Sequence, residues 1–171
     1  MTSILKVNQI QLPNGNTPTI GDLGLNNTHS ALQTLHTSTT TFTTATTTSF
    51  TDFANLSLTI TPSATDSLIL IQASLAAAVQ STASQVDVHG RIRLMRGSTE
   101  IYVLDLRTYE FNGDSVYVHV GMPFIFIDQP QSTSAITYKF QGKEVSSGCT
   151  SIDLNAEASN RSTFIIQELA G

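Results

Sequence analysis

The amino-acid sequence predicts an all-β protein: an antiparallel, jelly-roll-like sandwich preceded by a short extended N-terminal arm. Between Thr37 and Thr51, ten of fifteen residues are Thr, a β-branched residue type that fits a pleated surface. From there to the last residue, stretches of alternating apolar and polar residues are separated by clusters of turn-forming residues. No segment after the arm has a convincing helical periodicity and no repeat of fixed period is visible, which favours a two-sheet sandwich.

Composition excludes several classes of protein. The 171 residues suffice for one domain of ordinary size, and only 12% of them are charged, against about 25% in typical soluble domains. The net charge of −5 and the scattered basic residues argue against nucleic-acid binding. The longest apolar-rich run, 68–79, is interrupted by polar residues and too short to span a membrane. The single cysteine, Cys149, rules out a disulfide within one chain.

Residues 1–37 are expected to form the arm. The segment 4–12 alternates loosely like a short strand, and 26–35 has room for about two turns of helix. The arm is too small to bury a core of its own but too apolar for a solvated tail, so we expect it to become ordered by packing on another chain. The alternative is a floppy terminus. The expected anchoring residues are apolar: Ile4, Leu5, Val7, Ile10, Leu12 and Ile20.

Residues 38–171 are expected to form the sandwich, and its first half contains four expected strands. Residues 56–61 alternate cleanly, so that one face is buried and the other carries hydroxyl groups. Residues 67–80 are apolar on both phases, as is typical of a strand covered on both sides. The third strand, 86–94, alternates again and places four polar residues on one face: Asp87, His89, Arg91 and Arg93. After the turn at Gly97, residues 100–106 form the fourth strand.

The second half contains four more expected strands. Residues 116–127 form a long strand in which Pro123 marks a bulge, a bend or a sheet edge. Residues 134–140 follow a turn, 151–154 are short, and 163–169 close the domain. The total of eight to ten strands fits a jelly roll.

Two stretches resemble a group of bacteriophage virion proteins, common among phages of marine bacteria and cyanobacteria and described as tail-fibre or structural proteins. The first is the opening, Ser3-Ile4-Leu5-Lys6-Val7-Asn8-Gln9-Ile10. The second begins at Thr41-Phe42-Thr43-Thr44, continues through soft strand and turn patterns, and ends with Ile166-Gln167-Glu168-Leu169-Ala170-Gly171. The resemblance implies a trimeric β-sandwich knob on a virion appendage, with the opening segment docked on the particle. About thirty residues separate opening and knob, fewer than in many relatives, which favours a short fibre, a collar piece or a capsid decoration.

Trimerisation is also expected on physical grounds. The segments 67–80 and 121–127 have more apolar positions than a two-layer sandwich with a solvated outside needs, and symmetric copies commonly cover such a surplus. The alternative is a monomer with a thick core. The expected interface residues are Leu75, Ala77, Phe124 and Phe126.

A receptor or glycan site would need exposed aromatic and polar side chains in a shallow surface. The segment 100–117 offers such a set: Tyr102, Arg107, Tyr109, Glu110 and Asp114. The alternative is that these aromatics pack the corners of the sandwich. His89 and His119 would meet their copies if they lay near a trimer axis, but neither has neighbouring ligands at a metal-binding spacing. We therefore expect no metal and no cofactor.

The sequence contains no nucleophile elbow, zinc-protease motif or phosphate loop, so we expect no enzymatic activity and no catalytic residues. The prediction is a phage virion structural protein: a short homotrimeric tail fibre or appendage that binds tail, collar or capsid proteins through its arm and contributes to host attachment. It would be made in the host cytoplasm and released in the virion by lysis. The alternatives are a capsid decoration or cement protein and a lectin-like carbohydrate-binding module.

Overall fold

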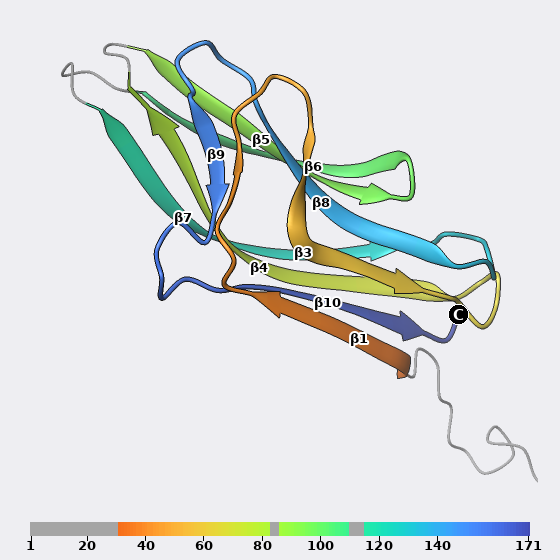
Figure 1. Cartoon of the computed structure of the whole chain (residues 1–171). Helices are drawn as coiled ribbons and strands as arrows, with labels where there is room; N and C mark the ends of the chain where they lie inside the picture. Colours follow the sequence, from red (N-terminus) through yellow and green to blue (C-terminus); the bar gives the residue numbers. More distant parts are fainter. Residues whose placement is uncertain (1–30, 83–85, 110–114) are drawn as a thin grey trace, which may run out of the picture.

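The computed structural model describes residues 31–82, 86–109 and 115–171, and all of its regular structure within these ranges is β-strand (Figure 1). The strands are β1 (Ala31–Thr39), β2 (Thr43–Ala45), β3 (Thr51–Ile60), β4 (Leu68–Ser81), β5 (Asp87–Arg96), β6 (Thr99–Tyr109), β7 (Val116–Asp128), β8 (Ile136–Glu144), β9 (Ser151–Leu154) and β10 (Ser162–Leu169). Nowhere in these ranges does a helix occur with the length and apolarity needed to cross a membrane.

The strands pair as a nested hairpin, first with last. β1 pairs with β10, β3 with β8, β4 with β7 and β5 with β6, all antiparallel. Two further pairings, β10 with β4 and β5 with β8, join these hairpins into the sheets β1-β10-β4-β7 and β3-β8-β5-β6. This is the order of a jelly roll, so the expected fold class is confirmed. The short strands β9 and β2 extend the first sheet beyond the end of β10.

The core lies between the two sheets and is filled by alternate residues of each strand. Tyr138, Phe140 and Phe164 are its largest fully buried side chains. Phe140 contacts both Phe164 and Phe124 edge-on, at ring-centre distances of 5.1 and 5.8 Å. Such aromatic contacts across the two layers fix their separation and their register.

The strand that opens the domain corrects one expectation. The two turns of helix for which 26–35 had room do not form in the described part of that segment, because Ala31–Thr39 is β1, hydrogen-bonded along its length to β10. Pairing with an existing strand and packing of Leu35 against the core outweigh a weak local helical preference. Residues 31–37, which the sequence assigned to the arm, therefore lie in the sandwich.

The position of Pro123 follows from the sheet order. Among the described strands, β7 pairs only with β4, so β7 is an edge strand, as the proline indicated. Proline has no backbone N–H to offer a further strand. A proline on this edge therefore discourages uncontrolled pairing with another chain.

A buried carboxylate holds one end of the sandwich together. Glu168 on β10 is fully buried and accepts hydrogen bonds from the Ser63 backbone N–H (2.7 Å), the Ser63 hydroxyl (2.6 Å), the Ser67 hydroxyl (2.7 Å) and the Gln33 amide (2.6 Å). Burial alone would raise the pKa of this carboxyl, but the hydrogen bonds outweigh it and lower the pKa to about 2. Glu168 thus ties β1, β10 and the turn before β4 to one another.

Candidate functional site

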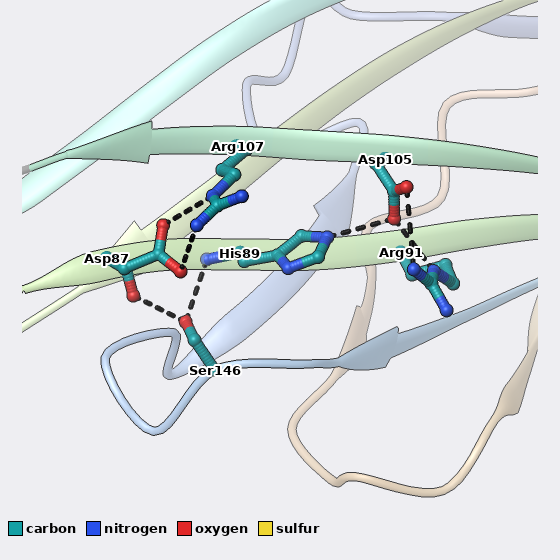
Figure 2. Close-up of polar contacts among 6 residues, drawn as sticks. All are labelled: Asp87, His89, Arg91, Asp105, Arg107 and Ser146. Carbon is teal, nitrogen blue, oxygen red and sulfur yellow. Dashed lines mark hydrogen bonds and ion pairs between the residues drawn. The ribbon is translucent and has the colours of Figure 1, made fainter.

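The outer face of the β3-β8-β5-β6 sheet carries a dense group of charged side chains. In β5, Val88, Gly90, Ile92 and Leu94 are buried. The intervening side chains point outward and are less buried, as the alternation of the sequence predicted. Figure 2 shows three of them, with their partners on β6 and in the turn after β8. The labelled residues are Asp87, His89, Arg91, Asp105, Arg107 and Ser146.

Asp105 lies between two partners. It faces Arg91 directly across the β5–β6 ladder and accepts a hydrogen bond from its Nε at 2.7 Å. The His89 Nε2 lies 2.9 Å from the same carboxylate oxygen (Figure 2). The hydrogen bond from Arg91 is the largest effect on the pKa of Asp105. Burial opposes it, but with the further hydrogen bond from His89 the pKa stays below its usual value.

Arg107 and Asp87 form a second pair at the end of the same ladder. The guanidinium holds the carboxylate with two contacts, Nε to Oδ1 at 2.7 Å and Nη2 to Oδ2 at 3.1 Å. The hydrogen bond to Asp87 raises the pKa of Arg107. Ser146 anchors the adjacent turn, because its hydroxyl accepts from the His89 backbone N–H at 2.9 Å and donates to the Asp87 carbonyl (Figure 2).

Arg93 continues this face toward the other end of β5. It donates to Gln141 at 2.7 Å and to Glu100 at 3.0 Å. Its guanidinium lies 3.7 Å above the centre of the Phe50 ring, which Lys143 also approaches at 4.8 Å. The face is therefore a fixed network in which most charges already have partners of opposite sign. Such a surface is strongly hydrated and can offer hydrogen bonds to a polar ligand.

The residues expected to bind a receptor or glycan are not brought together as one site. Tyr102 lies seven residues from Tyr109 on β6, about 23 Å along an extended strand. It packs edge-on against Phe124 at 5.0 Å and near Phe126 at 5.6 Å, which is the corner-packing role given as the alternative. Arg107 is paired with Asp87. The other two expected residues, Glu110 and Asp114, lie outside the described residues.

The apolar residues expected at a trimer interface lie instead inside the subunit. Leu75, Ala77 and Phe124 are buried in the core of their own sandwich, and Phe126 packs against that core. The surplus of apolar residues exists, but on the opposite phase of β7. The exposed positions are Ile125, at 71%, and Ile127, at 55%. A shift of one residue along a strand exchanges the buried and outer faces, and the sequence pattern did not settle this phase.

The two histidines that the sequence analysis considered as metal ligands have polar or aromatic neighbours. His89 contacts Asp105, and His119 on β7 lies 4.6 Å from the Tyr117 ring and 3.9 Å from Glu157. Within the described ranges, no three His, Cys, Asp or Glu residues are grouped so as to hold a metal ion. The anchoring residues of the arm, from Ile4 to Ile20, lie outside the described residues.

Comparison with known proteins shows no family for this chain. No protein-family model matches the chain, and no curated protein matches it in sequence. One similar solved structure is titled "Structure of infectious bursal disease virus Gx strain", with 12% sequence identity and a TM-score of 0.33. The match covers 80% of this chain and 38% of that chain. This chain thus corresponds to well under half the length of its structural neighbour.

Proposed function

We propose that the protein is a structural component of a bacteriophage virion: a short homotrimeric tail fibre or related appendage, held to the particle by its N-terminal arm. Its knob contributes to host attachment, and it acts by binding rather than by turnover. The observation that carries this proposal is the exposure of Ile125 and Ile127 after the sandwich has closed around its own core.

Exposed apolar side chains on a sheet face favour assembly. A contiguous apolar patch on an otherwise solvated domain marks a surface that another molecule covers. Closed symmetric oligomers are the commonest arrangement among soluble assemblies. Three joined subunits would also present three arms to the particle and three knobs to the host, which multiplies weak affinities without new contacts.

Three further observations support a place in a virion. The opening residues, from Ser3 to Ile10, resemble the docking segment of phage virion proteins. Jelly rolls are frequent among capsid and lectin domains, although a fold alone does not fix a function. The low content of charged residues also suits a subunit that buries part of its surface in an assembly.

Deletion of residues 1–24 tests whether the arm attaches the protein to the particle while the sandwich folds and trimerises without it. The first described strand begins at Ala31, so the deletion removes none of the described contacts. We expect the truncated protein to fold and trimerise but to be missing from purified particles, as measured by mass spectrometry and by labelling of particles in electron micrographs. A truncated protein that still enters particles, or a full-length protein absent from them, would contradict the proposal.

The same preparations separate the alternatives. A capsid cement protein would be labelled over the capsid, and its purified knob would not bind host cells. A lectin-like module would bind glycans equally well with and without residues 1–24 and would not be a component of particles. A fibre is expected at the tail or collar, with binding of the purified knob to host cells.

A further inference from the structure

We infer that the outer face of the β1-β10-β4-β7 sheet is the surface through which copies of this chain pack against one another. The inference deepens the proposed function and rests on its homotrimer, because it names the face that the subunits share. It replaces the interface that the sequence suggested with the opposite phase of the same strands.

The first observation is the absence of formal charge from this face. Among the described strands, none of the outward positions of β1, β10, β4 and β7 carries Lys, Arg, Asp or Glu; the only ionisable side chains there are histidines and a tyrosine. The opposite outer face of the molecule carries at least four arginine and lysine side chains. Depletion of charge is what distinguishes the centre of protein interfaces from ordinary surface.

The second observation is the cluster of apolar side chains at one end of the face. The register places Leu70 beside Ile127 and Gln72 beside Ile125 on neighbouring strands. On the other side of β4, Leu68 pairs with Leu169 in the same outer phase. The exposed Asp66 and the C-terminal Gly171 lie beyond the ends of β4 and β10 at the edge of this cluster, and Arg161 contacts Ser38 toward the other end of the sheet. The cluster has the contiguity that single exposed residues on a monomer lack.

The third observation is the shape of this surface. A shallow hollow of about 280 Å³ lies among Gln72, Ser74, Pro123, Ile125 and Ile165. Ile125, the most exposed of the large apolar side chains in the described ranges, lies at its margin. A protruding side chain beside a hollow allows related copies to interlock, because each copy supplies both shapes.

The size of the face also fits another copy. Four strands spaced by about 4.8 Å and seven residues of β4 cover roughly 19 by 23 Å, or about 450 Å² in projection. A standard interface takes about 800 Å² from each partner. The remainder of β4 and β7, around Ala76 and Gly121, extends the face toward that size, and the Glu157 carboxylate of the neighbouring loop lies beside His119 there. Because the outward strand positions carry no formal charge, most of the face meets no like-charge repulsion from its own copy.

The position at which β1 begins gives this arrangement a function. Ala31, the first residue of β1, pairs with Leu169 at the apolar end of the face, and the C-terminus lies at the same end (Figure 1). Copies packed through this face would therefore release their arms close together. Neighbouring arms would then engage one site on the particle in concert.

Sedimentation of the full-length protein tests the inference, with Ile125→Glu as the variant and Val145→Glu as the matched control. Both replace an exposed aliphatic residue, but Val145 lies in the turn after β8, away from the face. We expect the wild type and Val145→Glu to sediment as trimers, and Ile125→Glu to show a roughly threefold lower mass with an unchanged circular dichroism spectrum.

Cross-linking gives a second readout that does not depend on a destabilising charge. The native Cys149 is buried, so a cysteine introduced at Gln72 would be the reactive thiol. We expect a bifunctional maleimide to link Gln72→Cys subunits covalently, and to leave Thr59→Cys subunits, on the outer face of the other sheet, as single chains.

Three outcomes would overturn the inference. One is a wild type that remains a single chain at micromolar concentration, and another is an Ile125→Glu variant that keeps the wild-type mass. The third is cross-linking through position 59 instead of position 72. If the face were protected in particles while the free protein stayed monomeric, another virion protein would be its occupant. Incorporation into particles is measured separately, so the proposed virion role is tested independently of the interface between copies.

Discussion

Replacement of Glu168 by Gln is expected to destabilise the folded protein by about 3 kcal/mol at pH 7 and by much less near pH 2. Glu168 is fully buried and accepts four hydrogen bonds, from Ser63, Ser67 and Gln33. Glutamine keeps the shape but removes the negative charge and replaces one of the two carboxylate oxygens with an NH₂ group. The variant therefore weakens the hydrogen bonds to the remaining oxygen and turns a donor toward a donor at the other position.

The magnitude follows from the pKa of the carboxyl group. Its pKa falls from an ordinary 4.5 to about 2 in the folded protein. Each tenfold change in proton affinity corresponds to about 1.4 kcal/mol, which gives about 3 kcal/mol for the ionised group. Because the folded-state pKa is the lower one, this stability is fully present above pH 4.5 and is lost as the pH falls through about 2.

Urea denaturation followed by circular dichroism measures the effect at several pH values between 2 and 7, at one protein concentration. The quantity of interest is the difference in unfolding free energy between wild type and variant, because other carboxyl groups also titrate in this range. The control is Glu157→Gln, since the Glu157 side chain is 64% exposed. We expect the control to change stability by no more than about 0.5 kcal/mol at any pH.

A difference between wild type and Glu168→Gln that stays constant from pH 7 to pH 2 would refute the reasoning. It would mean that the carboxyl group keeps the same proton occupancy in the folded and unfolded chains. The hydrogen bonds to its oxygens would then not stabilise the ionised form.

Three further predictions concern the core. Gly142→Ala would place a methyl group 2.3 Å from the Phe53 ring and should lower the free energy of unfolding by about 1–3 kcal/mol in denaturation experiments. The loss should be smaller in a Phe53→Leu background, where the ring is absent. Equal losses in both backgrounds would exclude this clash as the cause. Tyr138→Phe should cost about 1–3 kcal/mol, because the buried hydroxyl donates to Asp128 at 2.6 Å, and a neutral effect would contradict that bond. Burial raises the pKa of the Cys149 thiol to about 11. A thiol reagent at pH 8 should therefore label Cys149 only after the protein unfolds. Labelling of the native protein would contradict this prediction, because it would show that the thiol is accessible.

The strands from β3 to β10 could be predicted from the sequence because their residues carry local signals, whereas β1 and β2 could not. Alternation in 56–61 and 86–94 identified β3 and β5 together with the polar face of β5, and turn residues such as Gly97 marked their ends. The proline of β7 indicated a bulge, a bend or an edge, and the sheet order shows that it lies on an edge strand. All of these signals lie within a few residues of one another in the chain.

The candidate surfaces could be predicted only in part from the sequence. The sequence placed Asp87, His89 and Arg91 on one face but gave no sign of the partner residues on β6, because cross-strand pairs depend on register. It placed Tyr102 and Tyr109 in one site, whereas the strand separates them and turns Tyr102 onto Phe124. The signal that would have shown this is the alternation of β6 itself.

The sequence by itself determined that this is an all-β chain with more apolar strand surface than one sandwich can bury. Composition and short-range periodicity carry that information, since both are properties of neighbouring residues. Only the tertiary structure decided which phase of β7 faces the core, that residues 31–39 form a strand, and that Glu168 ties distant segments together. These features arise from contacts between residues far apart in the chain. Where both phases of a strand are apolar, it is the pairing with neighbouring strands that selects one of them for burial.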